Sequence, residues 1–277
     1  ARSSLIHPTG FFDVSDTPKS HGRKTIRAAL KPRSLMDEPE ELAGVWQARV
    51  ITLFPEAFPG VLGLSLTGKA LQDGRWQLHT ENLRDHGIGK HRNVDDTPAG
   101  GGAGMVLRAD VVGPAIEAAQ SFAHGRWPIL YLSPRGRPFD QTMARDLARC
   151  DGVTLLCGRF EGVDERVLEH YGVTEVSIGD YVLTGGEIAA QALLDATVRL
   201  LPGVLGNAES TVDESHSNDL LEHPQYTRPA NWKDRSIPDV LMSGNHAEIA
   251  KWRRQKSEDI TAARRPDMTA RKKPDPS

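Results

Sequence analysis

The sequence predicts an α/β fold: a mainly parallel sheet with helices on both faces, followed by a smaller helical C-terminal domain. Between residues 129 and 201, short apolar segments alternate with helix-like segments, as is typical of a parallel sheet buried on both faces. A polar segment at 206–217 interrupts this pattern and indicates a linker. A basic amphipathic helix is expected at His246–Gln255 and indicates a second, helical module.

The composition is that of an ordinary globular protein. The chain has 277 residues, of which 38% are hydrophobic and 26% charged, and its net charge is −3; it can form one medium domain and a smaller one. No apolar run reaches the roughly 18 residues of a membrane span, so no membrane association is expected. The only cysteines, Cys150 and Cys157, suit a reducing cytoplasm and lack neighbouring ligands for a metal site.

The chain begins with a segment that does not contribute to this pattern. Residues 1–45 contain four prolines and no sustained periodicity, so we expect a disordered N-terminal extension. The first convincing strand is Arg49–Phe54, and the second is Trp76–His79. The glycine cluster Gly100–Gly104 has neither the Gly-Lys-Ser/Thr ending nor the G-x-G-x-x-G spacing of nucleotide loops. It indicates a flexible loop on the substrate side.

The alternation of helices and strands begins after Val106. Helices are expected at Asp110–Phe122, Gln141–Ala148 and Val163–His170, and strands at Ile129–Leu132, Val153–Cys157 and Val173–Ser177. Parallel sheets bind ligands at the carboxyl ends of their strands. The loops that follow three of these ends are Ser133–Gly136, Gly158–Gly162 and Ile178–Gly186. We therefore expect the three loops to converge on one ligand-binding rim.

A helix of about four turns is expected after the last of these loops, ending before Pro202. The residues Thr184 and Glu187 have the Thr-x-x-Glu spacing of a capping box. The adjacent glycines, Gly185 and Gly186, admit two interpretations: backbone N–H groups open to a ligand, or close packing of the helix against a strand. The spacing favours neither.

Several blocks in order carry a family resemblance: ITLFPEAF, HRNVDDTPAGGGAGM, YLSPRGR, LLCGRFEGVDERV, SIGDYVLTGGE, PGVLGN, LLEHPQYTRP and LMSGNHAEIAKWRRQ. From about Trp46 to Met268, the sequence resembles the bacterial tRNA (guanine-N1)-methyltransferases of the SPOUT superfamily. The resemblance implies a knotted AdoMet-binding methyltransferase domain at 46–205, a linker at 206–217 and a helical tRNA-binding domain at 218–277. The family usually has an aromatic residue at Ala99 and a proline at Ala103, so the contacts of the glycine-rich loop stay open.

The activity implied by the resemblance is transfer of a methyl group from S-adenosyl-L-methionine (AdoMet) to N1 of guanosine 37, next to the anticodon of tRNA. Residues of the three strand-end loops and one neighbouring strand are expected to bind AdoMet: Tyr131, Ser133, Pro134, Gly158, Glu161, Ile178, Gly179, Asp180, Tyr181, Val182, Leu183, Gly185 and Gly186. For Glu161, a contact with the methionine end of AdoMet or with the guanine is expected.

Three residues are expected to carry the chemistry. The resemblance aligns the general base with Glu214, and the neighbouring Asp213 is the alternative. It also assigns to Arg199 the stabilisation of charge on guanine O6. Each has a structural interpretation as well: the two acids as a solvated turn, and Arg199 as the i, i+4 partner of Asp195, worth about 0.2–0.5 kcal/mol.

RNA binding is expected on the C-terminal module. Within 251–277, nine Lys and Arg residues face four acidic residues, a local excess of positive charge. The residues expected to contact RNA are Asp96, Lys251, Arg253, Arg254 and Lys256, whereas Trp232 is expected in the core of the module. The resemblance further implies a homodimer and a magnesium requirement.

Two other functions remain compatible with the sequence. One is a different SPOUT RNA methyltransferase that modifies a ribose 2′-hydroxyl or another base. The other is a non-catalytic RNA-binding protein; AdoMet binding and the modified nucleoside distinguish the three.

Overall fold

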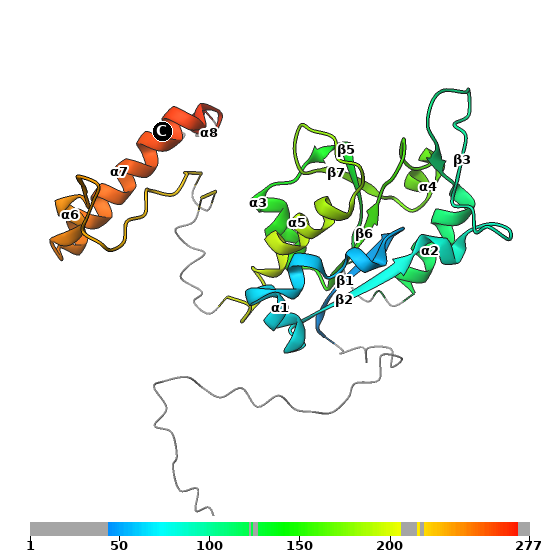
Figure 1. Ribbon diagram of the computed structural model, residues 1–277, viewed down its shortest axis with the longest axis horizontal. Helices are drawn as coiled ribbons and strands as arrows, with labels where there is room; N and C mark the ends of the chain where they lie inside the picture. Colours follow the sequence, from blue (N-terminus) through cyan, green and yellow to red (C-terminus); the bar gives the residue numbers. More distant parts are fainter. Residues whose placement is uncertain (1–43, 122, 124–126, 206–214, 217–218, 271–277) are drawn as a thin grey trace, which may run out of the picture. The chain divides into compact units, whose positions relative to one another are not determined.

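The computed structural model describes residues 44–121, 123, 127–205, 215–216 and 219–270. Its main sheet has five parallel strands (Figure 1), in the spatial order β2 (Trp76–Asn82), β1 (Trp46–Thr52), β6 (Gly152–Cys157), β5 (Ile129–Pro138) and β7 (Thr174–Ser177). The α/β, mainly parallel fold is confirmed. The strand order does not test the trefoil knot, which stays a prediction.

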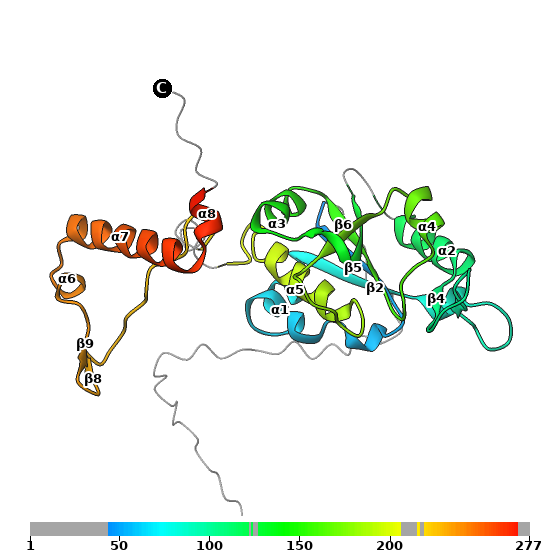
Figure 2. The ribbon, with the colours of Figure 1, turned by 90° about the horizontal axis from the view of Figure 1, so that it is seen from above.

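Helices cover both faces of this sheet (Figure 2). On one face lie α1 (Ser65–Gln72), α3 (Gln141–Ala148) and α5 (Glu187–Val198), and on the other lie α2 (Ala109–Gln120) and α4 (Glu165–His170). Side chains alternate along a strand, so Val50 and Leu155 join the core on the first face and Ile51 and Leu156 the core on the second. This double burial explains why β1 and β6 are buried along their whole length.

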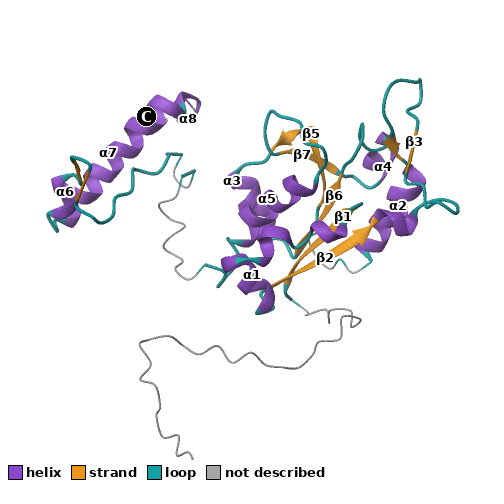
Figure 3. Cartoon of the chain, viewed as in Figure 1, coloured by secondary structure: helices purple, strands orange, loops and turns teal. Residues whose placement is uncertain are grey.

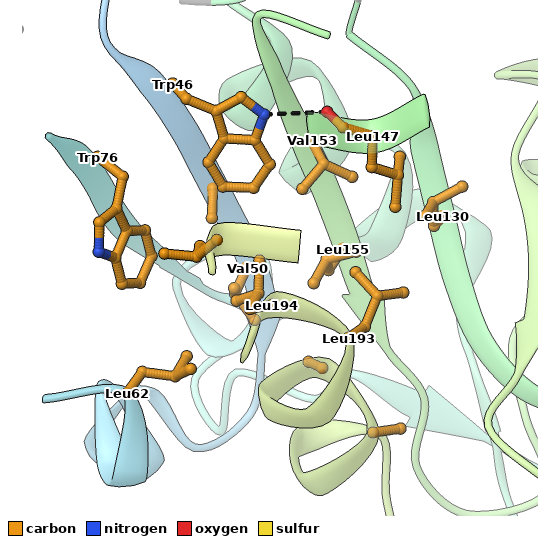
Figure 4. Close-up of a cluster of buried hydrophobic side chains, with 14 of the residues drawn as sticks. Trp46, Val50, Leu62, Trp76, Leu130, Leu147, Val153, Leu155, Leu193 and Leu194 are labelled. Carbon is orange, nitrogen blue, oxygen red and sulfur yellow. Dashed lines mark hydrogen bonds between the residues drawn. The ribbon is translucent and has the colours of Figure 1, made fainter. Parts of the chain in front are cut away.

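The core beneath α5 is the larger of the two (Figure 4). Leu193 and Leu194 of α5 pack there with strand residues such as Leu155, and all three are fully buried. The indole of Trp46 also lies in this core and donates a hydrogen bond of 3.1 Å to the carbonyl oxygen of Leu147. The polar atom of a buried indole is thereby satisfied. The sheet and α5 thus form one rigid support for the loops at the strand ends.

Several predicted elements need correction at their ends. The strand predicted at Arg49–Phe54 is β1, which runs from Trp46 to Thr52. The helix predicted at Val163–His170 is α4, which begins at Glu165. The strand predicted as Val173–Ser177 is β7, which lies at the edge of the sheet, and only its last two residues are buried. The 3₁₀ turns η1 (Pro55–Ala57), η2 (Gly60–Gly63) and η3 (Leu83–His86) complete this part.

A local irregularity in β5 shapes the sheet's carboxyl edge. Both Leu132 and Arg137 pair with Val176 of β7, so residues 133–136 leave the ladder between them. A Cβ atom on Gly136 would lie 2.3 Å from the backbone nitrogen of Val176, so the return path requires glycine. The excursion carries Ser133 out over the strand ends.

The C-terminal part is largely helical, as expected (Figure 3). It contains the hairpin strands β8 (Asn231–Trp232) and β9 (Arg235–Ser236), followed by α6 (Asp239–Met242), α7 (His246–Arg264) and α8 (Pro266–Ala270). The expected basic helix is thus α7, nine residues longer than predicted. The side chain of Asn245 caps it by accepting a hydrogen bond of 3.3 Å from the backbone of Glu248.

The two tryptophans of this part differ in their surroundings. Trp252 packs edge-on against His223 and Tyr226, with ring centroids 6.5 and 6.1 Å away. Trp232 is 59% exposed, so the expectation that it belongs to a core is wrong. Its hairpin is too short to bury a side chain on either face.

The domain boundaries stay predictions, because residues 1–43 and most of 206–217 lie outside the described part of the chain. Within the described part, no helix has the length and apolar character needed to cross a membrane.

Candidate active site

A cleft of about 320 Å³ lies at the carboxyl ends of β5, β6 and β7. The three loops predicted to converge there all line it, which confirms the common rim. Every residue predicted to bind AdoMet belongs to the lining except Asp180. The structure adds lining residues that the sequence prediction missed: Leu132, Arg135, Arg159, Phe160, Gly162, Val163, Val176, Ser177, Thr184 and Ala189.

The floor of the cleft is closed by a tyrosine beneath a glycine. Tyr131 is 5% exposed, and a Cβ atom on Gly158 would lie 2.6 Å from its ring. Only glycine allows this approach. Burial raises the pKa of Tyr131, with a smaller contribution from Glu175, so the phenol stays neutral at physiological pH.

The longest loop of the rim is held by local hydrogen bonds. The hydroxyl of Ser177 donates to the carbonyl oxygen of Gly179 at 2.9 Å and accepts from the N–H of Gly179 at 3.2 Å. Gly179 has φ +152° and lies against the ring of Tyr181, so a side chain there would collide with the ring. Tyr181 and Val182 are 55% and 80% exposed, which leaves two large apolar side chains open to a ligand.

A buried carboxylate ties this loop to the sheet. Glu187 is 5% exposed; its Oε1 accepts a hydrogen bond of 2.7 Å from the hydroxyl of Thr52, at the end of β1. Its Oε2 accepts one of 2.8 Å from Nη2 of Arg159. Arg159 also donates from Nη1 to the carbonyl oxygen of Thr184 at 3.2 Å, and its guanidinium lies 4.4 Å from the centroid of the Phe54 ring.

The predicted capping box is therefore wrong. The N-cap of α5 is Gly186, which makes no side-chain cap, and Thr184 lies two residues before it. Glu187 turns to Thr52 and Arg159 because a buried carboxylate needs strong donors, and these donors reach it from other strand ends. The tertiary contacts replace the local one.

Close packing explains the two glycines at the start of α5. The N–H of Gly186 donates to the carbonyl oxygen of Gly158 at 3.0 Å, and a Cβ atom on Gly186 would lie 2.7 Å from the Cα of Cys157. A Cβ atom on Gly185 would lie 2.3 Å from Nε of Arg159. The packing interpretation thus accounts for both, although both also line the cleft.

The thiol of Cys157 lies directly below this junction and is fully buried. Burial raises its pKa well above the usual value of 9.0, and the nearby Glu187 raises it further. A thiol that cannot ionise is a poor nucleophile. Cys157 is therefore part of the packing and not of the chemistry.

The glycine-rich segment between β3 (Asp95–Asp96) and β4 (Val106–Leu107) lies against the cleft residue Glu161. The backbone of Glu161 donates to the carbonyl oxygen of Met105 at 2.9 Å. Gly104, at φ +86°, lies so close to the Glu161 side chain that a Cβ atom would be 2.4 Å from it. The segment thus lies beside a cleft residue, as expected of a substrate-side loop.

Of the three predicted catalytic residues, Arg199 is the one in the described part of the chain, and it lies away from this cleft. Arg199 is the C-cap residue of α5, at the opposite end of the helix from Gly186, and does not line the cleft. Asp213 and Glu214 lie outside the described residues. Asp96 is exposed and accepts a hydrogen bond of 3.1 Å from Arg108, also outside the cleft lining.

The predicted RNA-binding cations all lie on α7. Nε of Arg254 donates to Glu258 at 3.1 Å, and Lys256 pairs with Asp259 at 3.5 Å. Within the described residues, Lys251 and Arg253 form no ion pair and are exposed. These two cations are thus the most readily available to phosphate.

No group of three His, Cys, Asp or Glu side chains that could hold a metal ion occurs among the described residues. The site missed most clearly by sequence reasoning is Arg159. Its signal was a charged side chain two residues after Cys157, the last residue of β6, within the GRFEG loop.

Together, a parallel sheet and a glycine-rich cleft at its carboxyl edge define an α/β protein with a ligand-sized cleft at its strand ends. More particularly, the chain belongs to the tRNA (Guanine-1)-methyltransferase TrmD family, which matches residues 46–271.

Several curated relatives agree with this assignment. A tRNA (guanine-N(1)-)-methyltransferase of Roseobacter denitrificans is 83% identical over 237 residues, 86% of this chain and 98% of the relative. Proteins of the same name from Ruegeria pomeroyi and Brucella suis are 73% and 57% identical, over 85% and 84% of this chain and 97% and 94% of the relatives.

Proposed function

We propose that this protein is a tRNA (guanine-N(1)-)-methyltransferase that transfers a methyl group from AdoMet to N1 of guanosine 37 in tRNA. The observation that carries the proposal is the strand-end cleft, lined by three loops whose sequences are those of the family resemblance. The 83% identical relative bears the name of this activity.

The cleft has the properties that AdoMet requires. AdoMet supplies an activated methyl group when bound. The edge of its adenine can pair with backbone N–H and C=O groups, and the loops that contain Ser133, Gly158 and Ile178 line the cleft. Exposed apolar side chains, Tyr181 and Val182, offer contact area for a ring. The carboxylate of Glu161 is suited to the ammonium group of the methionine end.

The chemistry requires a base and a cation. Guanine N1 carries a proton, and negative charge develops on O6 as this proton leaves and the nitrogen takes the methyl group. We propose that Glu214 removes this proton, with Asp213 as the alternative. A positioned base typically accelerates a reaction by about 10²–10⁴-fold. We propose that Arg199 stabilises the negative charge on O6. A positioned electrostatic donor typically accelerates a reaction by about 10²–10³-fold.

A homodimer would complete the site. Arg199 is twelve residues along α5 from Glu187, which corresponds to about 18 Å of helix, so one chain's cleft and its own Arg199 do not coincide. In addition, Val61, Leu64, Leu66 and Ile188 are 49–66% exposed. They lie on η2, α1 and α5 or beside them, elements that pack against one another. Exposed apolar side chains on neighbouring elements mark an interface, and we propose that a second copy covers them.

Three further assignments belong to the proposal. The cations of α7, chiefly Lys251 and Arg253, contact tRNA phosphates. The reaction takes place in the cytoplasm, which both the tRNA substrate and the free thiols suit. The magnesium requirement rests on the resemblance alone, and no step here uses the metal, because the described residues offer no ligand cluster.

The test is nucleoside analysis of unmodified tRNA incubated with the protein and methyl-labelled AdoMet. We expect 1-methylguanosine as the labelled nucleoside. A labelled 2′-O-methyl nucleoside, or label on another base, would assign the protein to a different reaction. Absence of both label transfer and AdoMet binding would favour a non-catalytic RNA-binding protein.

A further inference from the structure

The hairpin β8–β9 presents a tryptophan that does not contribute to a core. Trp232 is 59% exposed, and the other residues of the hairpin and its turn are exposed as well. Tryptophan is enriched at interfaces, because its large ring offers contact area and its N–H a polar group. The hairpin thus buries little surface and contributes little to the stability of the module.

Two cations accompany the indole. Nζ of Lys233 lies 4.8 Å from the centroid of the Trp232 ring. Arg235 is the direct cross-strand partner of Trp232, so the two side chains lie on the same face of the hairpin. The only acid in the hairpin is Asp234, in its turn. An aromatic side chain with two cations beside it is complementary to an unpaired base and its phosphates.

The backbone holds this arrangement in place. Lys233 and Asp234 adopt φ angles of +49° and +57°, which matches the twist of a two-residue hairpin turn. The hairpin is closed by a hydrogen bond of 2.9 Å from the N–H of Ile237 to the carbonyl oxygen of Ala230. A ligand would therefore meet a preformed aromatic surface, which lowers the entropic cost of binding.

We propose that Trp232 stacks on an unpaired nucleobase of the substrate RNA while Lys233 and Arg235 contact the adjoining phosphates. The proposal rests on the function proposed above, since it assumes an RNA substrate, and it adds a contact outside the basic helix α7. The apolar surface is a single ring with two cations near it, which fits a base better than the apolar interface of a second protein copy.

The experiment measures the Kd for labelled, unmodified tRNA with the full chain and its Trp232→Ala, Trp232→Phe and Lys233→Gln variants. The control is Met242→Ala, which removes an equally exposed apolar side chain (64%) from the same module. We expect Trp232→Ala to weaken binding about tenfold, because stacking on an aromatic side chain typically contributes that much or more. Trp232→Phe should lose less, and Met242→Ala nothing.

Two readouts separate stacking from other roles. The slope of log Kd against log salt concentration should be unchanged in Trp232→Ala and reduced by about one unit in Lys233→Gln. In addition, tRNA should protect tryptophan fluorescence from acrylamide in the wild type, and Trp232→Phe should abolish that part of the protection.

An unchanged Kd in a folded Trp232→Ala variant would overturn the inference, as would a Trp232→Ala variant that only shifts the monomer–dimer equilibrium. Wild-type protein that binds tRNA but transfers no methyl group would instead overturn the proposed function and leave this contact standing.

Discussion

The Arg159 guanidinium and the Glu187 carboxylate meet at 2.8 Å beneath the cleft, where their side chains are 24% and 7% exposed. The pair joins the GRFEG loop to the first turn of α5, and through Thr52 it also joins β1. Arg159 adds a hydrogen bond to the backbone of Thr184. The shape of the cofactor loop therefore depends on a network whose members come from three different strand ends.

Arg159→Ala should weaken AdoMet binding and destabilise the fold. Removing one partner leaves the Glu187 carboxylate buried without its cation, and such losses cost about 3 kcal/mol or more. The loop also loses the hydrogen bond from Arg159 to the carbonyl oxygen of Thr184. A charge-assisted bond is worth about 1.5–3 kcal/mol, so we expect the Kd for AdoMet to rise roughly tenfold to hundredfold. Calorimetric titration with AdoMet and urea unfolding check both effects.

Arg166→Ala is the matched control, because Arg166 pairs with Asp164 at the surface and is 80% exposed. It should change neither property by more than about 0.5–1 kcal/mol. Equal effects of the two substitutions would show that the Arg159–Glu187 pair has no special role.

The buried thiol predicts a loss of stability at high pH. Folding raises the pKa of Cys157, so the folded protein keeps this proton, whereas the unfolded chain releases it above about pH 9.0. Unfolding is therefore favoured as the pH rises through that value. Above about pH 9.0, the free energy of unfolding of the wild-type protein should fall by about 1 kcal/mol more per pH unit than that of Cys157→Ala. Urea unfolding at pH 8 and pH 10 measures the difference; parallel losses in both proteins would contradict the prediction.

The ion pairs on α7 predict which cations bind RNA. Lys251→Gln with Arg253→Gln removes two cations that form no ion pair with the described residues and should reduce the slope of log K against log salt by about 1.4–1.8 units. Arg254→Gln with Lys256→Gln removes cations already paired with Glu258 and Asp259 and should reduce it less. Filter binding of tRNA at several salt concentrations provides the comparison. A larger reduction of the slope in the Arg254→Gln, Lys256→Gln variant than in the Lys251→Gln, Arg253→Gln variant would place the RNA on the other side of the helix.

The proposed base and cation predict a specific kinetic pattern. Glu214→Gln should slow single-turnover methyl transfer by about 10²-fold or more, with AdoMet affinity unchanged, because the carboxylate acts on guanine. Arg199→Ala should be similarly slow, whereas loss of a surface pair with Asp195 would cost only a few tenths of a kcal/mol of stability. Rapid-quench assays measure both rates. A normal rate in Glu214→Gln with a dead Asp213→Asn would move the base to Asp213.

A mixture of two impaired variants, assayed at an AdoMet concentration too low for Arg159→Ala to bind it well, tests the shared site. If the cleft of one protomer uses the base of its partner, mixing Glu214→Gln with Arg159→Ala protein should produce heterodimers with one intact site and restore part of the activity. No recovery after subunit exchange would argue that each chain contains a whole site.

The sequence predicted the parts of the fold that depend on local pattern. Gln141–Ala148 is helical over the predicted range because Asp140 caps it and apolar residues recur at helical spacing. The convergence of three loops followed from the rule that parallel strands end at one edge. The resemblance then named twelve of the residues that line the cleft and missed ten.

What the sequence could not predict depends on contacts between distant residues. Glu187 does not form the expected capping box, because it accepts a hydrogen bond from the hydroxyl of Thr52, which is 135 positions away in the sequence. Trp232 was expected in a core because tryptophan usually is, but a hairpin of two-residue strands has no interior. Nothing in the periodicity indicated that β7 lies at the sheet edge.

The most direct test of the central claim is primer extension on unmodified tRNA after incubation with the protein and AdoMet. A methyl group on N1 blocks Watson–Crick pairing, so reverse transcriptase should stop immediately before guanosine 37, and only when AdoMet is present. A transcript with adenosine at that position should give no stop. Full-length extension of the wild-type transcript, or an AdoMet-dependent stop at another nucleotide, would contradict the account.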